Sequence, residues 1–169
     1  MPTNFYDKVA KNFGQYHTGA KYSKEYPAGD PEEVFKKNLL LLSGKAKIAL
    51  DSGCADGRFT LLNSSHFKKI IAIDLSKGML NAARKLQKDK KITNVDFEYM
   101  DVHKIKYPDK TFNVIYNRRG PTDYSEFHRL LKPEGHYLEI QIGEKDAKEI
   151  KVIFGRGQNF GEWNTSTLE

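Results

Sequence analysis

The chain has 169 residues but only one cysteine, Cys54, and one tryptophan. A single cysteine excludes a disulfide within the chain and a metal cluster held by several thiolates. Cys54 stands in a turn of small residues, where we expect a small buried side chain. The five histidines are scattered, and His17 has no neighbour of a type that ligates metals. We therefore predict no metal site.

Long hydrophobic runs are also missing. The run Leu39–Leu42 is four residues long, whereas a membrane-spanning helix needs roughly 18 or more apolar residues. The first residues, MPTNFYDKV, include an acid and no apolar segment, so they do not resemble a signal peptide. These absences predict a cytoplasmic protein with no membrane-embedded part.

What is present is a polar and mildly basic composition. The residues are 38% hydrophobic and 30% charged, and 28 basic against 22 acidic side chains give a net charge of +6. The length fits one domain with a sizeable core. A positive balance can favour RNA or another anionic substrate. The lysines, however, are spread along the chain, which solvated helix faces explain.

The most informative stretch is Lys47–Asp74, whose pattern predicts a strand, a glycine turn, a helix and a second strand. These parts are Ile48–Leu50, Ser52–Gly57, Arg58–Asn63 and Ile70–Ile73. Small residues after a strand let the backbone approach a ligand, and the next helix offers free N–H groups. Asp74, about twenty residues on, can accept hydrogen bonds from a ribose diol. The unit therefore predicts a site for an adenosine-bearing cofactor.

The glycine spacing decides between cofactors. The dinucleotide pattern Gly-x-Gly-x-x-Gly falls on Gly53, Ala55 and Arg58, and only the first is glycine. The pattern Asp-x-Gly-x-Gly-x-Gly falls on Asp51, Gly53, Ala55 and Gly57, and departs by one methyl group at Ala55. This second frame resembles the first motif of the class I S-adenosylmethionine-dependent methyltransferases. A nicotinamide oxidoreductase is disfavoured by the same spacing.

Two later segments strengthen this resemblance. Asp74-Leu75-Ser76 followed by Met79 is similar to the family's second motif, which implies that the acid holds the ribose and the next residue packs near the adenine. Asp101 stands where the family often has an acid for the adenine amino group, and the backbone amide of Val102 can meet the ring. Asp51, Asp74 and Asp101 each close a predicted strand, and the carboxyl ends of parallel strands share one crevice.

The resemblance implies an α/β fold: a Rossmann-like three-layer sandwich with a mostly parallel sheet, lacking part of the usual C-terminal strands. A truncated chain would explain that lack. Besides Lys47–Asp74, periodicity and capping residues predict further elements. The expected helices are Tyr6–Phe13, a helix capped by Asp30, Lys77–Lys88, Asp123–Leu131 capped by Thr122, and Glu144–Ile153; the expected strands are Val95–Met100, Thr111–Tyr116 and His136–Ile142.

Three parts of the chain are expected. Residues 1–29 form an aromatic segment, residues 30–155 the cofactor-binding domain, and residues 156–169 a polar tail whose end could derive from a vector. In the family a comparable first helix covers the cofactor pocket, which implies Tyr6 and Tyr16 as lid or substrate-facing residues. Simple packing of these aromatics onto the core explains them equally well.

The loop after the fourth predicted strand reads Asn-Arg-Arg-Gly-Pro. The family places its substrate-facing loop here, and Asn117 is the candidate for a cofactor or substrate contact. Amino-methyltransferases have Asp/Asn-Pro-Pro-aromatic at this point, so methylation of a nucleobase amino group is disfavoured. Arg118 and Arg119 can grip a carboxylate or a phosphate. Alternatively they pair with Asp51, Glu126 or the cofactor's own carboxylate.

The resemblance implies that S-adenosyl-L-methionine gives its methyl group to an unidentified acceptor, with a small metabolite favoured. RNA is the second choice of acceptor, and a non-catalytic methyltransferase-like binding module is the rival class. Methyl transfer from a sulfonium needs a base only if the acceptor must lose a proton. The scattered histidines offer no convincing base, so we assign no catalytic residue.

Overall fold

The computed structural model describes residues 3–16 and 25–143. In this part of the chain one sheet of five strands has the order β3-β2-β1-β4-β5, and every neighbouring pair is parallel. The strands are β1 (Gly44–Ser52), β2 (Phe67–Asp74), β3 (Val95–Tyr99), β4 (Phe112–Arg118) and β5 (Leu131–Ile140). The helices are α1 (Thr3–Phe13), α2 (Pro31–Leu42), α3 (Arg58–Asn63), α4 (Lys77–Asp89) and α5 (Tyr124–Leu130), with short 3₁₀ turns η1 (Ser64–His66) and η2 (Val102–Lys104).

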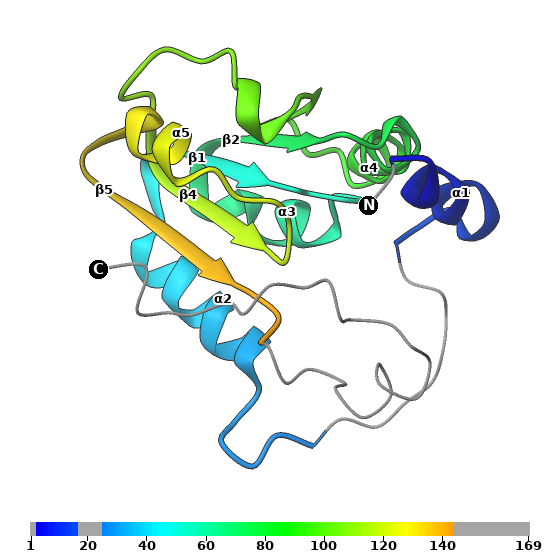
Figure 1. Cartoon of the computed structure of the whole chain (residues 1–169), viewed down its shortest axis with the longest axis horizontal. Helices are drawn as coiled ribbons and strands as arrows, with labels where there is room; N and C mark the ends of the chain where they lie inside the picture. Colours follow the sequence, from blue (N-terminus) through cyan, green and yellow to red (C-terminus); the bar gives the residue numbers. More distant parts are fainter. Residues whose placement is uncertain (1–2, 17–24, 144–169) are drawn as a thin grey trace.

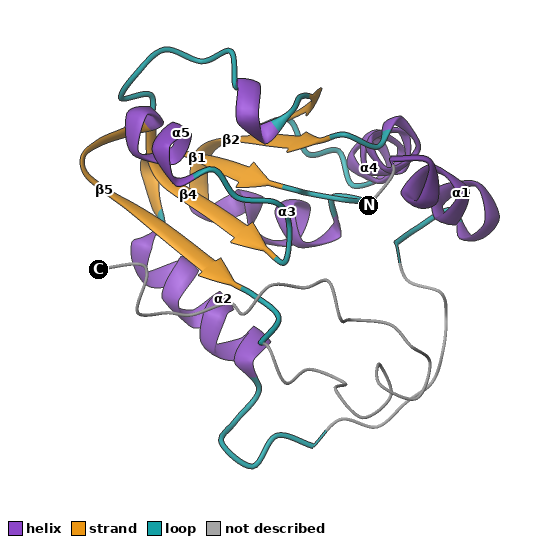
Figure 2. Ribbon diagram, viewed as in Figure 1, coloured by secondary structure: helices purple, strands orange, loops and turns teal. Residues whose placement is uncertain are grey.

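Helices cover both faces of the sheet, as Figures 1 and 2 show. Side chains of α2, α3 and α4 pack with Ala49 and Val114 in one apolar cluster. Side chains of η2 and α5 pack with Leu50 and Ile115 in a second cluster. Successive residues of one strand thus enter opposite clusters, which is why the central strands are apolar throughout. The predicted α/β three-layer sandwich is confirmed.

The strand order reverses on either side of β1. The chain goes from β1 outward to β2 and β3, and then crosses back to β4 on the other side. In such sheets a crevice forms outside the carboxyl ends of the strands at this reversal, and ligands bind there. The ends of β1, β2, β3 and β4 are therefore the place to look for the site.

Local signals predicted two helices closely. Asp30 caps α2 by accepting a hydrogen bond from the Glu32 amide, and Pro31 opens the helix. Ser76 caps α4 by accepting one from the Met79 amide. Both caps satisfy amides that the first turn of a helix leaves free.

Several predicted boundaries are wrong. β4 continues to Arg118, two residues past the predicted end, because its last residues still pair with β1 and β5. α5 is capped by Asp123, not by Thr122, since Asp123 accepts from the Glu126 amide. No described helix is long and apolar enough to span a bilayer.

β5 begins at Leu131, not at His136. An irregularity in its pairing with β4, between Phe112 and Val114, absorbs the extra residues, and Glu134 there has φ 62°. A bulge of this kind tolerates a proline in a strand. The predicted helix 144–153 lies outside the described residues, and the boundaries at 29 and 155 stay predictions.

Candidate functional site

The turn after β1 depends on its glycines. Gly53 and Gly57 have φ of +79° and +70°, the left-handed region that favours glycine. A Cβ atom on Gly57 would lie 2.6 Å from Cζ of Phe97. The amides of Gly53 and Cys54 both donate to the Ile73 carbonyl at 3.0 Å, which ties the turn to β2. Cys54 is buried, as expected.

Ala55 stands where the motif has a second glycine, and its φ is +47°. It therefore keeps the backbone conformation that a glycine would adopt. Its amide donates to Oδ2 of Asp74 at 2.9 Å. The turn and the predicted ribose-binding acid are thus joined directly, although 19 residues separate them in sequence.

Asp74 ends β2 with both carboxylate oxygens held. Oδ2 accepts from Ala55, and Oδ1 accepts from the Ser76 amide at 2.8 Å. Burial raises the pKa of the Asp74 carboxyl, and these amides oppose that shift. The Leu75 amide also acts on this carboxylate. A carboxylate has about four acceptor positions, so with three amide donors one position stays for a ligand hydroxyl. The arrangement fits a ribose hydroxyl.

Asp51 lies beneath the turn rather than open to the crevice. Its side chain is buried, and Oδ2 accepts from the Thr60 hydroxyl of α3 at 2.6 Å. Burial raises the pKa of Asp51 to about 6, although Thr60 and Tyr116 act in the opposite direction. Asp51 therefore supports the turn from below, and a direct cofactor contact stays a prediction.

A buried hydroxyl near the strand ends, Oγ of Ser52 at the end of β1, lacks a hydrogen-bond partner among the described residues. Buried polar groups are normally satisfied, and exceptions often mark places where a ligand or water binds. Together with the free position on Asp74, the Ser52 hydroxyl fits a polar cofactor in the crevice.

The remaining cofactor candidates lie at the starts of the segments after β2 and β3. Leu75 is half-buried, and Met79 is buried in the first turn of α4. Asp101 caps η2 by accepting from the His103 amide at 3.0 Å, and Val102 is buried. These residues share the carboxyl edge with Asp74, and their ligand contacts stay predictions.

The N-terminal helix lies beside the start of α4 (Figure 1). Asp7 accepts hydrogen bonds from the Ser76 hydroxyl and the Gly78 amide. The Tyr16 amide donates to Asp56 of the glycine turn at 3.0 Å. The ring of Tyr6 stacks on that of Tyr16. The pKa of Tyr6 is raised mainly by burial, and also by the nearby Tyr16 and Asp74. Residues 3–16 of the aromatic segment therefore lie along the rim at Asp74, where a lid would lie.

The arginine pair at the end of β4 is bound internally, by a partner that the sequence did not reveal. Arg118 and Arg119 both form ion pairs with Glu32, in the first turn of α2. The predicted alternatives, Asp51 and Glu126, are not their ion-pair partners; Glu126 pairs instead with Arg129. The prediction of internal pairing is thus right in kind and wrong in partner.

Asn117 holds the loop together. Its Nδ2 donates to the carbonyls of Gly120 and Pro121, and its Oδ1 accepts from the Gly120 amide at 2.8 Å. The side chain is fully buried. These contacts occupy its carboxamide, so any role toward a ligand goes through the loop that it shapes.

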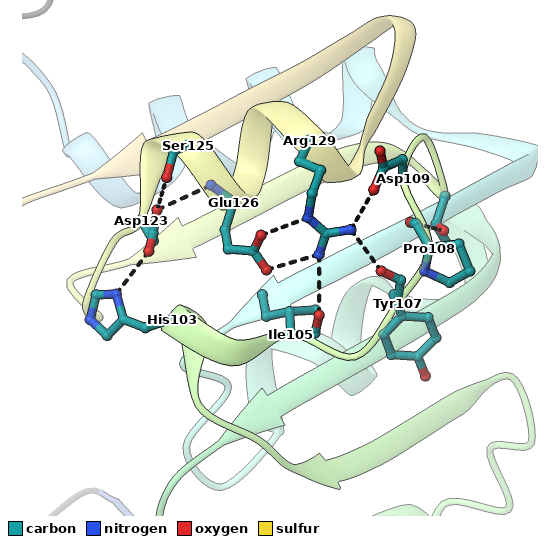
Figure 3. Close-up of polar contacts among 10 residues, drawn as sticks. His103, Ile105, Tyr107, Pro108, Asp109, Asp123, Ser125, Glu126 and Arg129 are labelled. Atoms are coloured by element: carbon teal, nitrogen blue, oxygen red, sulfur yellow. Dashed lines mark hydrogen bonds and ion pairs between the residues drawn. The ribbon is translucent and has the colours of Figure 1, made fainter.

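A polar network on the α5 face also escaped sequence analysis (Figure 3). His103, which we had treated as a scattered histidine, lies 2.9 Å from Asp123. The hydrogen bond from Ser125, and to a smaller extent that from His103, holds the pKa of Asp123 well below its usual range. Arg129 joins Glu126, Asp109 and the carbonyls of Ile105 and Tyr107. The network fastens the crossover before β4 to α5.

No group of three or more His, Cys, Asp or Glu side chains among residues 3–16 and 25–143 could hold a metal ion. What these residues do bring together is a glycine turn, an oriented acid and a rim segment. This arrangement can hold a nucleoside against the sheet edge.

Residues 49–135 of the chain match the family described as a methyltransferase domain. The chain is 29% identical over 114 residues to malonyl-[acyl-carrier protein] O-methyltransferase of Yersinia pestis, covering 61% of the chain and 39% of that protein. It is 26% identical over 174 residues to demethylmenaquinone methyltransferase of Symbiobacterium thermophilum, covering 95% of the chain and 64% of that protein. The chain spans only 20% to 39% of the first four curated relatives.

Solved structures have the same fold. A SAM-dependent methyltransferase from Aquifex aeolicus superposes with a TM-score of 0.61 at 19% identity, over 94% of the chain and 88% of that structure. The YcgJ protein of Bacillus subtilis has a TM-score of 0.61 at 22% identity, over 66% of the chain and 51% of that structure. At such identities the likeness concerns the fold alone.

Proposed function

The chain belongs to the methyltransferase-domain family, with the class I S-adenosylmethionine-dependent fold, and from this premise we propose that it transfers a methyl group from S-adenosylmethionine to a small-molecule acceptor. The carrying observation is the hydrogen bond between the Ala55 amide and Asp74. This bond fixes Asp74, the acid that would hold the ribose, next to the glycine turn. The turn would leave room for the rest of the cofactor.

We assign each part of the cofactor to different residues. Gly53, Ala55 and Gly57 leave the backbone bare where the cofactor passes the end of β1. Asp74 would accept from a ribose hydroxyl, and Leu75 and Met79 would supply apolar surface near the adenine. Asp101 would accept from the adenine amino group, and the Val102 amide would meet the ring.

Bound S-adenosylmethionine supplies a methyl group already activated on a sulfonium. The protein therefore has mainly to hold the two reactants in line and exclude water. Tyr6 and Tyr16 would cover the crevice from the rim, and Asn117 would shape the loop on the acceptor side.

Two alternatives from the sequence remain open. A binding module without activity would keep the cofactor site and transfer nothing, and RNA would use the basic residues as phosphate contacts. The cytoplasmic location also stays a prediction. A small acceptor is supported by relatives whose names refer to demethylmenaquinone.

Calorimetric titration with S-adenosylhomocysteine tests the cofactor assignment, with NADH as the control ligand. We expect micromolar binding of the first and none of the second. Asp74→Ala should weaken binding at least about tenfold, the loss of roughly 1.4 kcal/mol of hydrogen bonding to a charged acceptor. Asp89→Ala, at the exposed end of α4, is the matched control and should bind like the native chain.

Consumption of S-adenosylmethionine with a panel of small acceptors and RNA then separates the alternatives. Turnover with a small acceptor supports the proposal, and turnover only with RNA contradicts its acceptor class. Tight cofactor binding without turnover on any member of the panel supports the binding module. Absence of S-adenosylhomocysteine binding by the native chain would refute the cofactor assignment.

A further inference from the structure

We propose that Arg118 and Arg119 bind an oxyanion of the acceptor, a carboxylate or a phosphate, and that Glu32 occupies their binding site until the acceptor arrives. This inference rests on the proposed function, because it names the class of acceptor used at the same crevice. It follows from how the two guanidinium groups converge on one carboxylate.

The geometry of the Glu32 contact is that of a bound oxyanion. Arg118 contacts Oε2 of Glu32 at 2.8 Å, and Arg119 contacts Oε1 of the same carboxylate. One planar carboxylate therefore bridges two guanidinium groups, each oxygen taking one. Guanidinium forks are suited to carboxylate and phosphate oxygens. The two arginines are already spaced for an anion of this size.

The charges around this contact are unequal. Within the described residues Glu32 is the only carboxylate that forms an ion pair with either arginine. Two cations thus share one ion-paired carboxylate, although Arg118 also interacts electrostatically with the buried Asp51. Nε of Arg118 is also buried without a hydrogen-bond partner in the described chain. A phosphate, which brings more charge and more acceptor oxygens than a carboxylate side chain, would complement the pair better.

The contact is held in place yet open to solvent. The Arg118 guanidinium lies 4.0 Å from the centroid of the Phe59 ring, a cation–π contact that orients it. The backbone of Arg119 has φ 59°, and its amide donates to the Ile140 carbonyl of β5. The side chains of Glu32, Arg118 and Arg119 are 22%, 30% and 37% exposed. A small ligand can therefore reach them.

The pair also lies next to the proposed cofactor crevice. Gly120 directly follows Arg119, and its Cα would be 3.4 Å from a Cβ placed on Gly53 of the glycine turn. Burial raises the pKa of Asp51, which lies beneath that turn, and the charge of Arg118 is among the causes that oppose this rise. An acceptor anchored on the arginines would consequently extend toward the end of β1.

Glu32 can leave the pair at little cost. Burial alone would raise the pKa of Glu32. The hydrogen bonds from Arg119 and Arg118 outweigh burial, so the pKa of Glu32 is lowered. Because all three side chains keep contact with water, each ion pair is worth only about 1 kcal/mol or less. An acceptor oxyanion can then exchange with the glutamate. Glu32 would act as an internal competitor that keeps the arginines paired in the free protein.

The test is calorimetric titration with inorganic phosphate and, separately, with acetate, at fixed ionic strength. Glu32→Gln removes the competitor, and we expect the phosphate or acetate dissociation constant to fall at least about fivefold. Glu33→Gln is the matched control: it removes the same charge one residue on, from an exposed side chain. Glu33→Gln should change the anion dissociation constant less than about twofold, since neither Arg118 nor Arg119 forms an ion pair with Glu33.

Arginine variants give the opposite readout. Arg119→Gln, made in the Glu32→Gln chain and in the native chain, should abolish anion binding. Arg119→Lys keeps the charge but loses the fork, and should weaken binding at least about tenfold. Preference for phosphate or for acetate identifies the anion of the acceptor. If Glu32→Gln binds both probes no more tightly than Glu33→Gln, or if Arg119→Gln binds as the native chain does, the proposal is wrong.

S-adenosylhomocysteine binding is measured on the same variants and should stay unchanged. If the native chain does not bind S-adenosylhomocysteine, the cofactor assignment is refuted. The anion titration can still be interpreted in that case, so the two failures are distinguishable. A short single-stranded RNA that binds Glu32→Gln more tightly than phosphate, and loses this binding in Arg119→Gln, would overturn the small-molecule acceptor.

Discussion

Asp7 of α1 and Ser76 at the start of α4 are joined by a 2.6 Å hydrogen bond from the serine hydroxyl to the aspartate. The same carboxylate oxygen accepts from the Gly78 amide at 2.9 Å, while Ser76 accepts from the Met79 amide. An anion at the N-terminus of a helix is favoured by the helix dipole. The N-terminal helix thus helps to cap the helix that follows the ribose-binding acid.

Asp7→Ala tests this connection. The change removes the acceptor for Ser76 and Gly78, and we expect the free energy of unfolding to fall by about 1 to 2 kcal/mol, the usual cost of losing a cap. Urea unfolding followed by circular dichroism measures it. Asp89→Ala, at the other end of α4 and without a partner in the described chain, should change stability by less than about 0.5 kcal/mol. Equal losses in both variants would contradict the capping role.

Asp51→Asn tests the buried acid beneath the glycine turn. The pKa of Asp51 is raised from 3.8 to about 6, first by burial. Between these values the folded state holds a proton that the unfolded state has released. The stabilisation is therefore fully present below pH 3.8 and lost as the pH rises through about 6. Asparagine stays neutral, so the free energy of unfolding of Asp51→Asn relative to that of the native chain should rise by about 2 kcal/mol from pH 4 to pH 7.

Thr60→Val provides the matching change from the donor side. The Thr60 hydroxyl lowers the pKa of Asp51, so removing it should raise that pKa further and move the loss of stability to higher pH. Urea unfolding of the three chains at several pH values makes the comparison. If the free energy of unfolding changes with pH in the same way for the native chain and for Asp51→Asn between pH 4 and 7, Asp51 ionises as an ordinary carboxyl.

Gly57→Ala tests the steric demand of the turn. A Cβ there would lie 2.6 Å from Phe97 at a φ of +70°. Backbone strain of about 1 to 2 kcal/mol and overpacking of about 1 to 3 kcal/mol should both appear in the unfolding free energy. Gly14→Ala separates them, because Gly14 has φ +65° and open space around it. It should cost only the strain, and equal costs at the two sites would exclude a clash with Phe97.

Sequence reasoning succeeded where the determining residues are close together in the chain. The turn from Asp51 to Gly57 and the capped helices α2 and α4 depend on neighbours within one or two turns. Asp74 follows as well, since a strand, a glycine turn and a helix bring the end of the next parallel strand back to the same edge. These parts locate the cofactor crevice.

It failed where the partners are distant. Glu32 and Arg118 are 86 residues apart, and His103 and Asp123 are 20 apart across a crossover. Nothing in a local pattern tells which charged side chains will meet on adjacent elements. The start of β5 was missed for a related reason: Pro133 and Gly135 lie in the pairing irregularity, but Leu131 before them already pairs with Phe112 of β4, so the strand begins there.

Ala55→Gly tests the departure from the glycine motif. Alanine at φ +47° is strained by about 1 to 2 kcal/mol, whereas glycine loses about 0.5 to 1 kcal/mol of conformational entropy on folding. We therefore expect the variant to be as stable as the native chain or up to about 1 kcal/mol more stable in urea unfolding. The backbone amide still reaches Asp74, so S-adenosylhomocysteine should bind at least as tightly in calorimetry. Ala82→Gly, inside α4, makes the same change at a helical backbone and should cost about 1 kcal/mol. If both variants lose stability equally, Ala55 is not strained, and its methyl group contributes packing that a glycine cannot replace.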